Sequence, residues 1–156
     1  MKSLAILASS FLLATPAAAQ EHASPTDTTA VLTAIKALFA GLTAKDPAQI
    51  TAATWPEGRA TGTSTTASGE ARVTGSDWAT FSSRIATIPG KPVERNIDPH
   101  VHVDGDIAMV WTPYVFTIDG KFSHCGTNHF DLVRKEGTWK ILNVTWTQRK
   151  TGCPAE

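Results

Sequence analysis

Apolar side chains recur at helical spacing in three segments of the first half of the chain. The clearest stripe runs through Val31, Leu32, Ile35, Leu38, Phe39 and Leu42. This spacing predicts an amphipathic helix over residues 27–44, capped at Thr26-Asp27. A short second helix is expected at residues 47–53, where a proline suits the first turn. A third helix should begin at Ser76-Asp77 and stop before Pro89-Gly90.

The second half of the chain is rich in the β-branched and aromatic residues that favour strands. Four such runs span residues 93–103, 107–118, 122–134 and 139–149. They are separated by Asp104-Gly105, Asp119-Gly120 and Glu136-Gly137, which are strong signals for tight turns. Residues 57–74, rich in Thr, Ser and Gly, predict two further short strands. Helices followed by an antiparallel meander make the predicted fold class α+β.

Turn geometry predicts which side chains share a face of this sheet. A two-residue loop at Asp119-Gly120 would pair Ile118 with Lys121, and counting onward pairs Trp111 with Asn128. One face would then be apolar with a few polar groups. Its members are Met109, Trp111, Val115, Phe122, His124, Asn128, Phe130, Leu132, Trp139, Ile141, Asn143 and Thr145. The opposite face would be mostly polar, with one apolar patch made of Leu142, Val144 and Trp146.

The N-terminus has the pattern of an export signal. Lys2 precedes the apolar run Leu4–Leu13, and the small residues Pro16–Ala19 predict cleavage after Ala19. The run is too short to cross a bilayer, which takes about 20 residues. We therefore expect a signal peptide at residues 1–19, a flexible leader at 20–26 and one domain at 27–156, secreted or periplasmic. An uncleaved membrane anchor is the alternative.

Charge and motifs exclude several classes of function. Removing 19 of the 156 residues leaves a mature chain of 137, enough for one domain with a core. The whole chain carries 14 basic and 14 acidic residues, so nothing indicates a nucleic-acid or membrane-surface binder. No nucleophile elbow, phosphate loop or dinucleotide fingerprint is present, and we expect no cofactor.

The two cysteines, Cys125 and Cys153, are expected to form a disulfide, because an oxidising compartment favours the bridge. His124 precedes the first of them. Successive strand residues point to opposite sides of a sheet. His124 would therefore face the apolar side, while Cys125 would face away and meet a C-terminal tail that folds back at Gly152.

The order of elements and several motifs resemble the nuclear transport factor 2-like superfamily, also called SnoaL-like. More narrowly, the chain is similar to small secreted bacterial members of that group. The matching motifs are Pro56–Arg59, Trp111–Phe116, Asp119–Gly126, Phe130–Arg134, Trp139–Ile141 and Gly152-Cys153. The resemblance covers nearly all of the mature chain. It implies a cone in which a strongly bent sheet wraps around helices and encloses a pocket.

The same resemblance implies a homodimer through the outer sheet face, where Leu142, Val144 and Trp146 are expected to lie. It does not fix an activity, because the superfamily holds isomerases, dehydratases, cyclases, epoxide hydrolases and binding domains. Its enzymes use pocket acids and histidines to move protons. Asn128 stands where we expect an acid in the secreted subgroup, and this departure weakens a pairing of His124 with a carboxylate.

His124 is the leading candidate for chemistry, because an imidazole titrates near neutral pH. Three roles are open for it: a hydrogen bond in a semi-polar core, contact with a ligand, or acid–base catalysis. Trp111, Asn128, Asn143 and Thr145 complete the predicted pocket. A buried amide needs a partner, so the asparagines either form a fixed network or orient a ligand.

His100 and His102 lie two residues apart on a strand and would point to the same side. Such a pair can bind a metal with His129 as a third ligand, but the signal is weak. A three-residue loop pairing Val103 with Ile107 would place Val101 and Val103 inside and both histidines in solvent. We favour this arrangement and expect no metal site.

Three functions follow from these residues. The leading one is binding of a small, largely apolar ligand with a few polar groups. The alternatives are a cofactor-free lyase, isomerase or hydrolase that uses His124, and a structural or protein-interaction module that uses the exposed sheet face. Whether the protein is an enzyme is left open at this stage.

Overall fold

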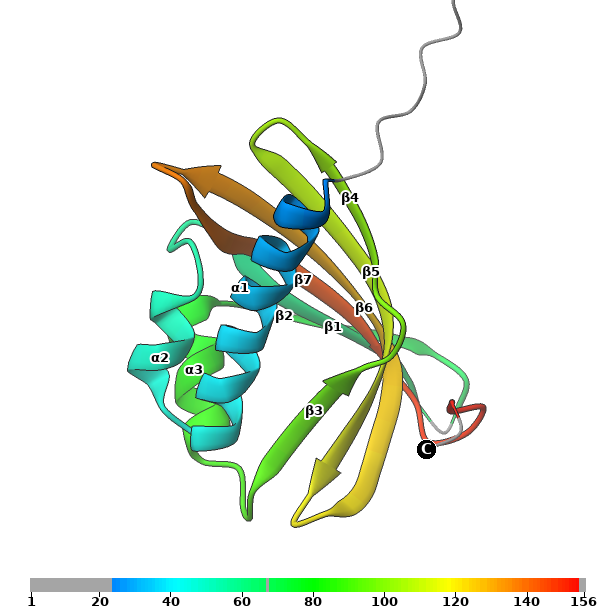
Figure 1. The fold of residues 1–156 in the computed structure, drawn as a ribbon. Helices are drawn as coiled ribbons and strands as arrows, with labels where there is room; N and C mark the ends of the chain where they lie inside the picture. Colours follow the sequence, from blue (N-terminus) through cyan, green and yellow to red (C-terminus); the bar gives the residue numbers. More distant parts are fainter. Residues whose placement is uncertain (1–23, 67, 155–156) are drawn as a thin grey trace, which may run out of the picture.

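The computed structural model describes residues 24–66 and 68–154, so the predicted signal peptide lies outside the described residues. Its helices are α1 (Pro25–Ala44), α2 (Pro47–Ala52) and α3 (Trp78–Ala86). Its strands are β1 (Arg59–Thr65), β2 (Ala71–Asp77), β3 (Pro92–Asn96), β4 (His100–Asp104), β5 (Ile107–Ile118), β6 (Lys121–Lys135) and β7 (Thr138–Gln148). The helices pack on the concave side of a strongly curved sheet (Figure 1). The predicted α+β cone is confirmed.

The sheet has seven strands in the order β2-β1-β7-β6-β5-β3, and β4 also pairs with β5. All pairs are antiparallel except β1 with β7, which run parallel. The expectation of a wholly antiparallel sheet is therefore wrong at this one pair. None of the helices in the described part of the chain is long and apolar enough to cross a membrane.

Each helix begins at a side chain that accepts hydrogen bonds from its first turn. Ser24 caps α1 by accepting from the amide of Asp27, and this cap starts the helix two residues earlier than the apolar stripe predicts. Asp46 accepts from the amides of the second helix, with a proline in its first turn. Asp77 accepts from the amide of Thr80 at 2.7 Å and begins α3.

The predicted strand at residues 93–103 is two strands. Both β3 and β4 pair with β5, one after the other, and the chain bends between them at Asp98-Pro99. Asp98 has a φ of 47°, and Pro99 has no amide hydrogen to donate to a ladder. A single continuous strand is therefore impossible across this dipeptide.

Two β-bulges change the predicted register. Ser123 is an extra residue in β6, since Phe116 pairs with His124 and Thr117 pairs with Phe122. A bulge adds one residue to one strand and so moves every later side chain of the partner to the other face. Trp111 consequently pairs with His129 rather than with Asn128.

The second bulge lies in β7 at Leu142, because Leu132 pairs with Ile141 and Asp131 pairs with Asn143. Beyond it, Val144 and Trp146 turn inward and pack on the core, whereas the predicted register places them on the outer face. The predicted dimer patch is therefore wrong as a surface, since Val144 is only 5% exposed. The homodimer itself stays a prediction without that surface.

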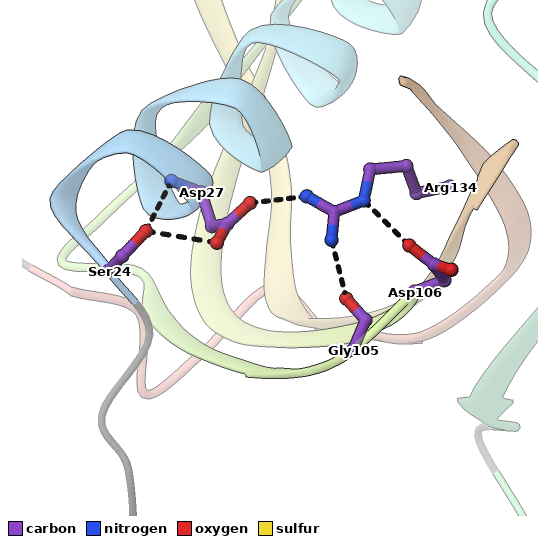
Figure 2. Close-up of polar contacts among 5 residues, drawn as sticks. All are labelled: Ser24, Asp27, Gly105, Asp106 and Arg134. Atoms are coloured by element: carbon purple, nitrogen blue, oxygen red, sulfur yellow. Dashed lines mark hydrogen bonds and ion pairs between the residues drawn. The ribbon is translucent and has the colours of Figure 1, made fainter. Parts of the chain in front are cut away.

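Arg134, near the end of β6, joins the start of α1 to the β4–β5 turn (Figure 2). Its Nη1 pairs with Oδ1 of Asp27 at 2.6 Å, and its Nε pairs with Oδ1 of Asp106 at 2.8 Å. Its Nη2 donates to the carbonyl of Gly105 at 2.9 Å. The flanking carboxylates hold the pKa of Arg134 above its ordinary value, with Asp106 the larger influence. We call Arg134, Asp27, Asp106 and Gly105 the arginine clamp.

Replacing Arg134 with alanine is expected to loosen the first turn of α1, because Asp27 loses its ion-pair partner. Amide hydrogen exchange in that turn should be faster in the variant than in the wild type. Exchange in α3, which the clamp does not contact, should be the same in both proteins. Arg72→Ala, which removes an exposed arginine of β2, is the matched control and should leave exchange in α1 unchanged. Equal exchange in the wild type and Arg134→Ala would contradict the role of the clamp.

Candidate functional site

A cavity of about 320 Å³ lies between the helices and the concave face of the sheet. The helices and the segment after α3 contribute Leu38, Phe39, Leu42, Phe81, Ile85 and Ile88. The strands contribute Glu94, Tyr114, Phe116, Ile118, Ser123, His124, Asn128, Phe130, Val144, Trp146 and Gln148. The lining is mostly apolar with a few polar groups, as in small-molecule pockets generally.

Aromatic rings form much of this lining. Phe39 meets Phe130 edge to face with 6.1 Å between ring centroids, and Phe81 meets Trp146 in the same manner at 6.1 Å. These pairs join the helices to the inner face of the sheet. The cavity is therefore walled by rings from both layers, which suits a flat ligand.

Glu94 is the carboxylate of the cavity. It lies on the edge strand β3 opposite Phe116 and accepts a hydrogen bond from Nδ2 of Asn128 at 2.6 Å. Asn128 also donates to Oδ1 of Asn96 at 3.3 Å. Burial raises the pKa of Glu94 to about 7, against the smaller opposing effect of the Asn128 hydrogen bond. Near neutral pH the side chain is thus poised between acid and carboxylate.

His124 faces the cavity, as the alternation of strand residues predicts. Its ring stacks on Phe116 with centroids 4.6 Å apart, and its Nδ1 lies 3.1 Å from Oγ of Ser123. Burial lowers the pKa of His124, and the nearby charge of Lys150 lowers it further. Within the described residues, no carboxylate is hydrogen-bonded to His124. The imidazole is therefore mostly neutral at pH 7 and has no acidic partner.

Tyr114 closes another part of the wall. Its hydroxyl donates to the carbonyl of Thr147 at 2.9 Å, which joins β5 to the end of β7. Burial raises its pKa, and the nearby charge of Glu94 adds to the effect. The phenol is therefore a fixed neutral group over the range of pH in which Glu94 titrates.

The structure brings together only part of the predicted pocket. His124 and Asn128 line the cavity, but Trp111 points outward, is 53% exposed and lies near His129. Asn143 also lies on the outer face, where it donates to Asp131 and accepts from the amide of Arg59. Thr145 is exposed. The two bulges explain these three misplacements, since each reverses the face of the residues beyond it.

The predicted disulfide between Cys125 and Cys153 is confirmed. Cys125 is fully buried on the side of β6 away from the cavity, and its backbone pairs with Arg149 in the tail. The following residue must be glycine, because a Cβ at Gly126 would overlap the carbonyl oxygen of Thr147. The bridge therefore fastens the C-terminal tail to the back of the strand that carries His124.

His100 and His102 are exposed, while Val101 and Val103 pack against the core. This orientation agrees with the one we favour, but the loop is shorter, since Asp104 pairs with Ile107. Among the described residues, no three histidine, cysteine or acidic side chains form a group that could hold a metal. A larger hollow of about 620 Å³ lies around this turn and is more polar than the inner cavity.

Comparison with known proteins agrees with this architecture. The sequence model of the family described as "Putative lumazine-binding" matches residues 26–147. No curated protein sequence matches the chain at a significant level.

Solved structures show the fold. A protein of unknown function with a cystatin-like fold from Nostoc punctiforme is 9% identical, with a TM-score of 0.66 over 86% of this chain and 98% of that one. An NTF2-like protein of unknown function from Shewanella baltica is 13% identical, with a TM-score of 0.61 over 84% and 100%. Another from Silicibacter pomeroyi is 18% identical, with a TM-score of 0.55 over 81% and 100%. The expected nuclear transport factor 2-like fold is confirmed.

Proposed function

Because the chain belongs to the family described as "Putative lumazine-binding", we propose that it is an exported domain that binds a small, flat, largely apolar ligand in the inner cavity. The observation that carries this proposal is the lining: rings from helices and sheet, with a few polar groups gathered around Glu94 and His124. The volume of about 320 Å³ lies at the lower end of the range for ligand pockets. It suits a molecule of one or two rings.

Two observations support export. The N-terminus has the charge, apolar run and small residues of a signal peptide. The disulfide between Cys125 and Cys153 fits an oxidising compartment, where such bridges persist. Intact mass measurement of the protein from the periplasm or medium should show a chain that begins at Gln20. A full-length chain found only in the cytosol would contradict export.

Native mass spectrometry of the protein taken from its own source tests the binding function. We expect one small molecule to be released on activation. Lumazine, a flat two-ring nitrogen heterocycle, is the first ligand to titrate, because the family carries its name. Quenching of tryptophan fluorescence gives the affinity, since Trp146 lines the cavity.

Two phenylalanine variants make the binding test specific. Phe39→Ala removes a ring from the cavity wall and should weaken binding about tenfold, the effect of losing one aromatic contact. Phe122→Ala removes a ring that is 46% exposed and does not line the cavity, and it should leave the affinity unchanged. An equal loss in both variants would argue against the inner cavity as the site.

Proton transfer to a bound ligand is the second candidate function. It is favoured by Glu94, because a pocket carboxyl with a pKa of about 7 can accept and return a proton near neutral pH. His124, the acid–base candidate from the sequence, is hydrogen-bonded to no carboxylate in the part of the chain that the structure describes. Deuterium uptake from D2O by a bound carbonyl compound, lost in Glu94→Gln, would favour catalysis. No uptake in the presence of saturating ligand would favour binding alone.

A further inference from the structure

The lining of the inner cavity includes an acidic side chain and, among the described residues, no lysine or arginine. The titratable groups of this lining in the described part of the chain are Glu94, Tyr114 and His124. Tyr114 has a raised pKa and His124 a lowered one, so both are neutral near pH 7. Burial and the Asn128 hydrogen bond are the influences on Glu94, and no basic side chain is among them. An ionised Glu94 therefore has no counter-charge from residues 24–66 and 68–154.

The hydrogen bonds around Glu94 leave one of its oxygens free. Oε1 accepts from Asn128, whose amide also donates to Asn96, so both amide hydrogens are in use. Oε2 receives no hydrogen bond from any described residue. It is nevertheless not among the fully buried side-chain oxygen and nitrogen atoms that lack a partner. This acceptor is therefore accessible, and Glu94 is one of the residues that line the cavity. A partner for it must donate hydrogen bonds.

We propose that the ligand carries a cationic nitrogen with N–H groups, such as an amidine, an amine or a protonated ring nitrogen, which binds the free oxygen of Glu94. This inference rests on the proposed binding function and narrows its ligand class from flat heterocycles in general, such as uncharged lumazine, to flat cations. The flat apolar part of the ligand lies against Phe39, Phe130 and Trp146. An anionic ligand would meet the carboxylate, because the basic side chains near the cavity, Arg149 and Lys150, act on Tyr114 and His124 and not on Glu94. A neutral ligand would leave an ionised Glu94 without a counter-charge.

Three probes of one shape and different charge test the inference: benzamidine, benzamide and benzoate. At about pH 8 Glu94 is ionised, and benzamidine should bind about tenfold to a hundredfold more tightly than benzamide, the range for a hydrogen bond between charged groups. Benzoate should not bind. Glu94→Gln should reduce the affinity for benzamidine to that for benzamide. Glu57→Gln, at an exposed residue outside the cavity, is the matched control and should behave as wild type.

A second measurement distinguishes the loss of a charge contact between Glu94 and benzamidine from a change in the shape of the cavity. At about pH 6 Glu94 is largely protonated, so benzamidine must displace its proton. Calorimetry in buffers of different ionisation enthalpy should report proton release, and the affinity for benzamidine should rise from about pH 6 to pH 8. Both effects should vanish in Glu94→Gln and persist in His124→Asn, which removes the imidazole of the cavity.

Each result of the three-probe test either supports or overturns the inference. Equal binding of benzamidine and benzamide, or tighter binding of benzoate, would overturn the inference and leave ligand binding intact. Binding of none of the three would also overturn it, since the amidine carries the proposed group on a single ring. The released molecule seen by native mass spectrometry decides the proposed function separately.

Discussion

Glutamine in place of Glu94 is expected to raise the free energy of unfolding at pH 8 by about 2 kcal/mol. Burial raises the pKa of Glu94 from its ordinary value of 4.5 to about 7 in the folded protein. Below about pH 4.5 both states hold the proton, so this stability is fully present there, and it is lost as pH rises through 7. The shift corresponds to about 3 kcal/mol, and partial exposure of the side chain reduces this to about 2.

Urea unfolding at several pH values checks this expectation. The wild type should lose stability between about pH 5 and pH 8, whereas Glu94→Gln should show a flatter profile over the same range. The glutamine still accepts from Asn128, so the hydrogen bond at Oε1 is preserved. Glu57→Gln should follow the wild-type profile. Parallel profiles for the wild type and Glu94→Gln would show that burial does not hold the proton on Glu94.

If the wild type is less stable than Glu94→Gln, the carboxyl group lowers the stability of the fold, and a role in folding does not explain its presence. Residues that destabilise a fold often serve its function, because a site needs groups that the fold alone would not choose. The stability measurement and the probe measurements therefore both test whether Glu94 serves ligand binding rather than folding. Gain of stability with loss of benzamidine binding is the expected combination.

Removing the disulfide should have an effect of similar size and opposite sign. The bridge joins residues 28 positions apart, and the chain-entropy model assigns about 3.5 kcal/mol to a loop of this length. The double variant Cys125→Ala, Cys153→Ala should therefore unfold about 2–4 kcal/mol more easily in urea. Ligand affinity should stay unchanged, because Cys125 faces away from the cavity that His124 lines.

A reducing agent provides the control for the disulfide. Reduction should destabilise the wild type toward the stability of the double variant and leave the double variant itself unchanged. A double variant as stable as the oxidised wild type would mean that the tail is held by its backbone pairing at Arg149 rather than by the bridge. A loss of ligand affinity in the double variant would mean that the two faces of β6 are coupled.

The elements of this fold could be predicted from the sequence because their signals are local. The stripe from Val31 to Leu42 marks α1, and the turn at Asp119-Gly120 marks the hairpin of β5 and β6. The pairing of Ile118 with Lys121 next to that turn is as predicted. Errors begin where register depends on counting through a bulge. One extra residue at Ser123 was enough to place Trp111 in the pocket instead of outside it.

Glu94 was missed for a different reason. In the sequence it lies in Val93-Glu94-Arg95, and two adjacent charged residues are typical of a strand exposed to solvent. Only the tertiary arrangement places its side chain in a cavity opposite Asn128. Asn128 carried the available signal: a polar amide on an otherwise apolar face requires a partner. The sequence predicts no carboxylate beside His124, because Asn128 stands where an acid is expected. The cavity does hold an acid, but it comes from β3 and pairs with that amide.

The arginine clamp has a consequence for how firmly the helical wall of the cavity is held. It pins α1 at Asp27, whereas the cavity lies beside the far half of that helix, at Leu38, Phe39 and Leu42. At that far end Lys45 donates to the carbonyl of Ile88, which ties α1 to the segment after α3. The helix is thus fastened near both ends, at Asp27 and at Lys45, while the residues between them line the cavity. A ligand therefore meets a wall whose position is set by contacts on either side of it, and its thickness must match the space that these contacts leave.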